Sequence, residues 1–141
     1  MASLPEQIEI EKESIVSTLK YLDTVLARED KTVIELAAIA TFIQNVYGGV
    51  ENILKRILRY KKINISFDDS WHKNILSLSA KHKIISKDVF ERLDEYRAFR
   101  HFFVHSYSFT LNESKLLPLA NNLKEAWSSF EVEIDQYLKS Q

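Results

Sequence analysis

Apolar residues recur at intervals of three and four along most of the chain, which is the spacing of an amphipathic α-helix. The first such stretch runs from about Leu4 to Arg28, with Ser3 as its capping residue and Pro5 in its first turn. One stripe along it carries Ile8, Ile15, Leu19, Leu22 and Leu26. This 3.5-like spacing predicts packing in a helical bundle.

A second helix is predicted to open at Thr32, because Thr32 and Glu35 match the capping box that satisfies two backbone donors. Its apolar face consists of Leu36, Ile39, Ile43, Val46, Val50, Ile53 and Ile57. Gly48 and Gly49 interrupt this face, and two glycines inside a helix cost about 1.5 to 2 kcal/mol relative to alanines. We expect close approach of another helix to compensate, and a ligand approaching the backbone is the alternative.

Two further helices are predicted in the middle of the chain. The first is short and contains Trp71, His72 and Leu76. Its capping residue is one of Asp68, Asp69 and Ser70. The next helix begins at Ser86, and its candidate core residues are Val89, Leu93, Tyr96 or Ala98, Phe99 and Phe103.

A final long helix follows a cap at Asn112 or Ser114. Its apolar residues are Leu116, Leu119, Leu123, Trp127, Phe130, Ile134 and Leu138. The chain has only two glycines and two prolines, too few for the many turns of an all-β domain. The sequence therefore predicts an all-α bundle of four to five helices with a short inserted helix. With 141 residues, one domain spanning 1–141 is expected.

Composition narrows the class of protein. Hydrophobic residues make up 45% and charged residues 28%, and no apolar run approaches the roughly 18 residues that span a bilayer, so we expect no membrane segment. The amino terminus lacks a basic leader and an apolar core of a secretion signal, so a cytoplasmic location is expected. Cysteine is absent, which excludes disulfides, thiolate zinc sites and cysteine nucleophiles. A net charge of −1 argues against nucleic-acid binding through a global field and leaves room for a local basic patch.

One local cluster of cations lies at the carboxyl-terminal end of the second predicted helix. It consists of Lys55, Arg56, Arg59, Lys61 and Lys62. Cations in this place complement the helix dipole and stay solvated, or they form a patch that contacts phosphate.

The segment from Arg100 to Tyr107, RHFFVHSY, concentrates titratable side chains among phenylalanines. In a regular helix Arg100 and His105 project about 140° apart, whereas Arg97 with His101, and His101 with His105, are neighbours on one face. His101 and His105 resemble half of a helical zinc site, but no third ligand is evident and we predict no metal.

The plain structural alternative assigns these side chains to an ordinary amphipathic helix. In that interpretation Arg97, Arg100 and His101 line the solvent face, while Phe99, Phe102 and Phe103 are buried.

The motif Arg100-x4-His105-x-Tyr107 resembles the R-x4-H-x-Y motif of HepT-type toxins, which are members of the HEPN superfamily of helical ribonucleases. Chance produces the Arg-x4-His pair about once in six chains of this composition and the form with tyrosine about once in a hundred and fifty, so the longer form is fairly specific. The segments 47–57, 71–73 and 93–109 are also similar to HepT-like proteins in order and style. The resemblance covers most of the chain and implies a single HEPN domain over 1–141.

This resemblance implies a metal-independent RNA endonuclease that needs no cofactor and acts on tRNA or mRNA at a homodimer interface. His105 would be the general acid or base, and Arg100 would hold the phosphate. Further candidates for contacts to flanking RNA phosphates are Arg97, His101, Lys55, Arg56 and Arg59.

The resemblance also implies a protein partner, a cognate minimal nucleotidyltransferase antitoxin that transfers AMP groups to Tyr107. An added AMP places a negative phosphate beside the arginine meant for RNA. The alternative for Tyr107 is a packed or hydrogen-bonded phenol.

Two other residues in similar segments stay outside the predicted catalytic set. Glu51 either orients a basic residue of the site or is a solvated helical glutamate, and His72 is expected to be structural. The rival functions are a catalytically silent HEPN module that binds a nucleotide or a partner protein, and a plain helical interaction protein.

Overall fold

The structure, a computed structural model, describes residues 2–105 and 112–141, with only the backbone of residues 104 and 105. Within these ranges the chain forms α-helices and no strand, which confirms the all-α prediction. The helices are α1 (Leu4–Leu26), α2 (Val33–Tyr60), α3 (Trp71–Lys81), α4 (Lys87–His105) and α5 (Glu113–Lys139).

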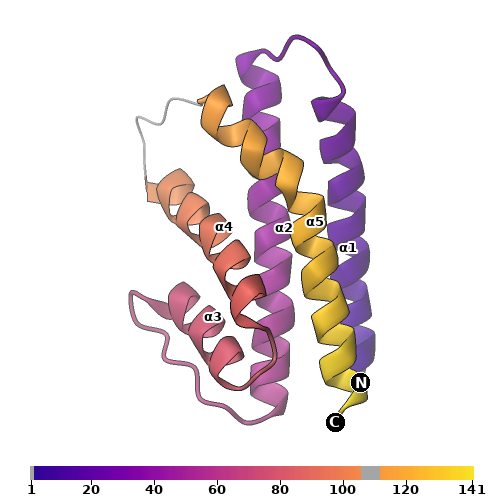
Figure 1. The fold of residues 1–141 in the computed structure, drawn as a ribbon, viewed down its shortest axis with the longest axis vertical. Coiled ribbons are helices and arrows are strands. Elements are labelled where there is room, and N and C mark those ends of the chain that lie inside the picture. Colours follow the sequence, from indigo (N-terminus) through magenta and orange to yellow (C-terminus); the bar gives the residue numbers. More distant parts are fainter. Residues whose placement is uncertain (1, 106–111) are drawn as a thin grey trace.

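The helices form a bundle around α2 (Figure 1). α1 and α2 are a long antiparallel pair, and α5 crosses in front of them on a diagonal. α4 runs along the side of the bundle, and the short α3 lies beside the beginning of α4. α2 contacts each of the other four helices, so its neighbours determine which of its side chains meet water.

Polar side chains start four of the helices, as predicted from the sequence. The side-chain oxygens of Ser3, Thr32, Ser86 and Asn112 accept backbone N–H groups of the first turns. Ser70 precedes α3 without such a side-chain bond. Since capping by these residue types is a local interaction, it can be read directly from the sequence.

α2 is buried over more than one face. The whole predicted apolar face of α2 is buried, and so are Ala40, Tyr47, Gly49, Glu51, Leu54 and Leu58. By length and composition alone α2 could cross a bilayer, contrary to the expectation that no segment approaches that length. Packing against four helices accounts for this apolarity, because a helix surrounded by protein is apolar on several sides.

α4 departs from the plain amphipathic pattern. Tyr96 rather than Ala98 joins the core, and its hydroxyl donates to the carbonyl oxygen of Leu119 at 2.7 Å. Phe99 and Phe103 are only half-buried, and Phe102 is 52% exposed. The interpretation that buries Phe102 is therefore wrong.

The two adjacent glycines of α2 have different surroundings. A Cβ atom on Gly49 would lie 2.7 Å from Cγ1 and 2.8 Å from Cδ1 of Ile15, whereas a Cβ on Gly48 would meet no atom of the described residues within 4 Å. Close approach of α1 therefore explains Gly49, as expected, and does not explain Gly48.

Alanine at each glycine tests this difference. Gly48→Ala should raise the free energy of unfolding by about 0.5 to 1 kcal/mol, because alanine favours the helix and nothing clashes. Gly49→Ala should lower it by about 1 to 2 kcal/mol, since the buried Ile15 must move and overpacking outweighs the gain in helix propensity. Urea unfolding of the two variants measures both values. Equal effects at the two positions would show that α1 does not impose the glycine.

Candidate functional site

Arg100 lies on α4 between two pockets and lines both of them. The larger one, the α3–α4 pocket, has a volume of about 630 Å³. It is lined by Phe67, Asp68, Asp69, Ser70, Trp71, His72 and Lys73 and, from α4, by Arg97, Arg100 and His101. Of the predicted site residues, the structure thus brings Arg97, Arg100 and His101 together at one wall.

The smaller one, the glycine pocket, has a volume of about 430 Å³ and is lined by residues of α1 and α2 together with Arg100 of α4. Its lining residues besides Arg100 are Glu11, Ser14, Ile15, Thr18, Gln44, Asn45, Gly48, Gly49 and Asn52. Gly48 leaves the α2 backbone open toward this space, since a Cβ there would touch none of the side chains that the structure describes. Arg100 is therefore the residue of α4 that both pockets share.

A buried hydrogen-bond partner of His72 lies behind the wall of the α3–α4 pocket. Glu51 on α2 is only 3% exposed, and its two carboxylate oxygens lie 2.8 and 2.9 Å from Nδ1 of His72. A carboxylate can only accept, so Nδ1 donates and the other ring nitrogen, Nε2, is left for a second partner. The ring of Trp71 lies against that of His72, with centroids 3.6 Å apart.

The solvated alternative for Glu51 is therefore wrong. Burying a carboxylate costs several kcal/mol unless it is paired and hydrogen-bonded, and His72 supplies that pairing. The sequence did carry a signal for this burial, because Glu51 stands beside Val50 and close to Ile53 in the most apolar helix of the chain.

Tyr47 and Arg97 extend the polar cluster around Glu51. Burial, and then the charge of Glu51, raise the pKa of Tyr47 well above its ordinary value, while the charge of Arg97 opposes this shift. Among the described residues the Tyr47 hydroxyl has no hydrogen-bond partner of good geometry. Nε of Arg97 donates to Oδ1 of Asp94 at 2.6 Å, and this bond raises the pKa of Arg97.

The predicted cations of α2 divide between two sides of the helix. Nζ of Lys55 lies 5.1 Å from the ring centroid of Trp71, beside the α3–α4 pocket. Arg56 instead donates to Gln7 at 3.1 Å and to Glu11 at 3.2 Å, both on α1. Arg59 is exposed in the last turn of α2. Consecutive residues of a helix point about 100° apart, so Lys55 and Arg56 do not form one patch.

The remaining predicted residues are placed only in part. His105 is the last residue of α4, and its side chain lies outside the described part of the chain; Tyr107 lies outside the described residues altogether. Across the side chains that the structure describes, no group of three or more His, Asp or Glu stands close enough to hold a metal ion.

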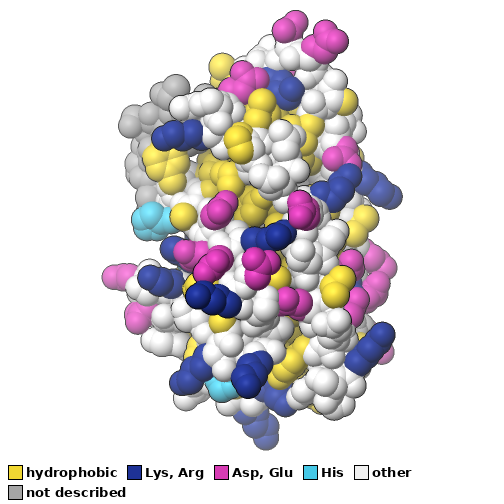
Figure 2. All heavy atoms as spheres, viewed as in Figure 1, with side chains coloured by type: hydrophobic (Ala, Val, Ile, Leu, Met, Phe, Trp, Pro, Cys, Tyr) yellow, Lys and Arg dark blue, Asp and Glu magenta, His cyan; other side chains and the backbone are white. Residues whose placement is uncertain are grey.

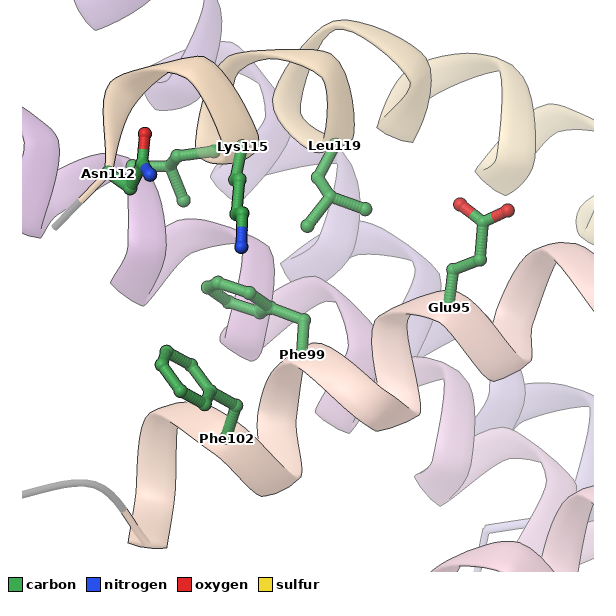
Figure 3. A pocket seen from close by; sticks show the side chains of 7 residues that line it. Glu95, Phe99, Phe102, Asn112, Lys115 and Leu119 are labelled. Atoms are coloured by element: carbon green, nitrogen blue, oxygen red, sulfur yellow. The ribbon is translucent and has the colours of Figure 1, made fainter. Parts of the chain in front are cut away.

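The opposite side of α4 carries a third pocket of different character, with a volume of about 370 Å³. It is lined by Glu95, Phe99, Phe102, Asn112, Lys115, Leu116 and Leu119. Figure 3 shows Phe99 and Phe102 of α4 facing α5, from which Leu119 and the Lys115 amine point toward them. The polar chemistry of α4 is thus concentrated on the side of Arg97 and Arg100.

Most of the surface in this view mixes both charges. Figure 2 shows basic and acidic side chains interspersed over the middle of this face, basic side chains together at its lower end, and apolar side chains gathered between the upper parts of α4 and α5. This distribution agrees with the net charge of −1. A charged ligand would therefore be bound by a local pocket rather than attracted by a long-range field of the whole protein.

Comparison with known proteins identifies the family. A family model described as HepT-like protein matches residues 38–141, from the first turns of α2 to the end of the chain. The chain belongs to the HepT-like family. The matched range of this HepT-like chain contains the whole α3–α4 pocket and the Arg100-x4-His105-x-Tyr107 motif.

One solved structure is similar over the full length of both chains. It is described as "Crystal structure of the toxin-antitoxin with AMP-PNP", and its chain has 16% sequence identity to this HepT-like chain and a TM-score of 0.71. At this identity the likeness concerns the fold. A comparison with curated proteins gave no significant match.

The pH dependence of unfolding tests the buried phenols. Burial raises the pKa of Tyr47 and of Tyr96, whereas both ionise near pH 10 in the unfolded chain. The contribution of each buried phenol to the free energy of unfolding is fully present below about pH 10. It is lost as the pH rises toward the folded-state pKa, by at most about 1.4 kcal/mol per pH unit for each tyrosine.

The measurement is urea unfolding at several pH values from about pH 9 to about pH 11. Tyr47→Phe and Tyr96→Phe should each make the loss of unfolding free energy with pH less steep than in the parent protein. An unchanged slope in both variants would contradict the buried, neutral state of these phenols.

Proposed function

We propose that this protein is the toxin of a toxin–antitoxin pair and a metal-independent RNA endonuclease that uses Arg100 and His105. Membership in the HepT-like family and the likeness in fold to a chain of a toxin–antitoxin structure support this function. The observation that carries it is the position of Arg100, which lies at the junction of two polar pockets and five residues before His105 on the same helix.

The proposed reaction is transesterification of RNA. A general base removes the proton of a ribose 2′-hydroxyl, the 2′-oxygen attacks the adjacent phosphorus, and the bond to the 5′-oxygen of the next nucleotide breaks. A general acid protonates that leaving oxygen, so the products are a 2′,3′-cyclic phosphate and a 5′-hydroxyl. His105 serves as base or acid because an imidazole populates both forms near neutral pH.

Arg100 holds the phosphate during this reaction. A guanidinium stays charged and donates two parallel hydrogen bonds to phosphate oxygens, which stabilises the charge that develops on the phosphorane. In a homodimer, a second His105 is available for the complementary proton transfer. Two-fold symmetry would bring two copies of the motif to one interface, and this arrangement is part of the proposal.

A nucleotidyltransferase antitoxin is the proposed partner, and Tyr107 is the proposed acceptor. The Tyr107 oxygen attacks the α-phosphorus of ATP, and pyrophosphate leaves. The AMP group then occupies space and adds negative charge next to Arg100, so RNA is excluded sterically and electrostatically. The nucleotide analogue in the description of the similar toxin–antitoxin structure is consistent with a nucleotide-using partner.

Cleavage of purified RNA in EDTA tests the catalytic proposal. Unmodified protein should cut tRNA or mRNA, and His105→Ala and Arg100→Ala should each reduce the rate by about a hundredfold or more. Products are resolved on a denaturing gel.

Two matched controls accompany these variants. His82→Ala removes an exposed histidine at the far end of α3, and Arg92→Ala removes a surface arginine that pairs with Asp88 and Glu125. Both should cleave like the parent protein. Absence of cleavage by the unmodified parent protein would contradict the proposed ribonuclease activity and favour a catalytically silent binding module.

Mass spectrometry tests the modification. Incubation with the cognate antitoxin and ATP should add one or more AMP groups to the peptide that contains Tyr107 and abolish RNA cleavage. Tyr107→Phe should stay unmodified and active in the same mixture, whereas Tyr60→Phe should be modified and silenced like the parent. Modification at another residue, or inhibition of the Tyr107→Phe protein, would contradict this assignment.

A further inference from the structure

We propose that the α3–α4 pocket is a nucleotide subsite, in which Phe67 stacks on a base and His72, oriented by Glu51, contacts a phosphate. The inference rests on the proposed ribonuclease function and deepens it, because it names the surface that holds the RNA residue next to the cleaved bond. The R-x4-H-x-Y motif contains none of the three residues Phe67, His72 and Glu51.

The pair of Glu51 and His72 indicates a built site. Glu51 is almost completely buried, and packing alone does not require a carboxylate at this position, since an apolar residue of similar size would avoid the desolvation cost. Its oxygens hold Nδ1 of His72 at 2.8 and 2.9 Å. This bond fixes the ring orientation and tautomer, as a carboxylate does for a metal-binding or catalytic histidine, and the ring lines the pocket.

Cations on α4 supply the rest of the phosphate contacts. Arg97 and Arg100 are three residues apart and line the same pocket. Asp94 accepts from Nε of Arg97, a bond that does not engage the two terminal amino groups of the guanidinium. Those two groups can donate parallel hydrogen bonds to two phosphate oxygens.

The acidic residues of the pocket favour a nucleotide over a free anion. Asp68 is used locally, because its Oδ1 accepts from the backbone N of Ser70 at 2.8 Å and from Nδ2 of Asn74 at 3.3 Å. Asp69 is exposed and lines the pocket, where its carboxylate would repel a simple anion. A nucleotide carries an anionic phosphate together with amino and hydroxyl donors, so it can satisfy both signs of charge.

Phe67 provides the aromatic surface for the base. This residue is 56% exposed and lines the pocket, and the centroid of its ring lies 5.5 Å from that of the Trp71 ring. Trp71 already contacts His72 and Lys55, so it supports Phe67 rather than offering a free face of its own. An exposed aromatic ring beside arginines is the arrangement with which proteins stack unpaired RNA bases. The pocket volume of about 630 Å³ is within the range of small-molecule sites and accommodates one nucleotide.

Binding of a 2′-O-methyl RNA oligonucleotide tests the subsite without catalysis, because this probe lacks the 2′-hydroxyl that attacks phosphorus. Trp71 is in the pocket wall and Trp127 is buried in the core, so intrinsic fluorescence reports on the pocket. The oligonucleotide should change the fluorescence of the parent protein, and Trp71→Phe should remove most of that change.

Substitutions then locate the contacts. Phe67→Ala and His72→Gln should each weaken oligonucleotide binding by about tenfold or more, as expected for loss of a stacked base or a phosphate contact. Tyr60→Ala removes an exposed aromatic ring at the end of α2 and should bind like the parent. Because Phe67 is exposed, its removal leaves the core intact even if the His72 variant is less stable.

Glu51 is tested as a positioning residue. In Glu51→Gln an amide oxygen still accepts from Nδ1, so binding should stay within about threefold of the parent, whereas Glu51→Leu should lose it. Imidazole nitrogen shifts measured by NMR should show a proton on Nδ1 of His72 in the parent and in Glu51→Gln, and loss of this preference in Glu51→Leu. A purely structural role for Glu51 would leave the tautomer unchanged.

The outcomes separate the subsite from the proposed reaction. Parent-like binding and cleavage by Phe67→Ala and His72→Gln would overturn the subsite and leave the ribonuclease standing. Oligonucleotide binding that depends on Phe67 and His72, in a protein that does not cut RNA, would support the subsite and sink the ribonuclease. Binding of free AMP and ATP is measured in the same way. If these nucleotides bind and the oligonucleotide does not, the proposal that the pocket holds a nucleotide of RNA is wrong.

Discussion

Four helices bury α2, and the main features of the structure follow from this packing. Ile39, Ile43 and Ile53 have no exposed surface, and the exclusion of water from their surroundings supplies the main stabilising free energy. Because water is excluded around α2, each buried small or polar residue on it needs a specific neighbour. Gly49 admits Ile15 of α1, and Glu51 needs the hydrogen bonds of His72.

The candidate site follows from that burial. Because Glu51 is buried under the first turn of α3, the most stable place for His72 is against it, and this pairing joins the beginning of α3 to α2. α3 also packs against α4. The pocket between α3 and α4 then receives Arg97 and Arg100 from one side and the aromatic residues around Trp71 from the other. The core helix and the polar pocket are therefore parts of one arrangement.

α4 separates two environments along its length. Its side toward α5 carries Phe99 and Phe102 and borders an apolar pocket, whereas the side with Arg97 and Arg100 borders polar ones. The apolar residues of α4 do not continue as one buried stripe, because Val89, Leu93 and Tyr96 are in the core whereas Phe99 and Phe102 border a pocket and are partly exposed. Periodicity therefore described α4 less well than α1, α2 and α5. The partial exposure of its phenylalanines is the consequence.

The helices, their caps and the Arg100-x4-His105-x-Tyr107 motif could be read from the sequence, because helical periodicity, capping and motif spacing are local along the chain. Which polar residues contact one another depends on the packing of the helices. Glu51 and His72 are 21 residues apart, and the neighbours Lys55 and Arg56 contact α3 and α1 respectively. Such contacts depend on which neighbour covers each face of a helix, and the covering helix is chosen by packing of the whole bundle rather than by any short segment.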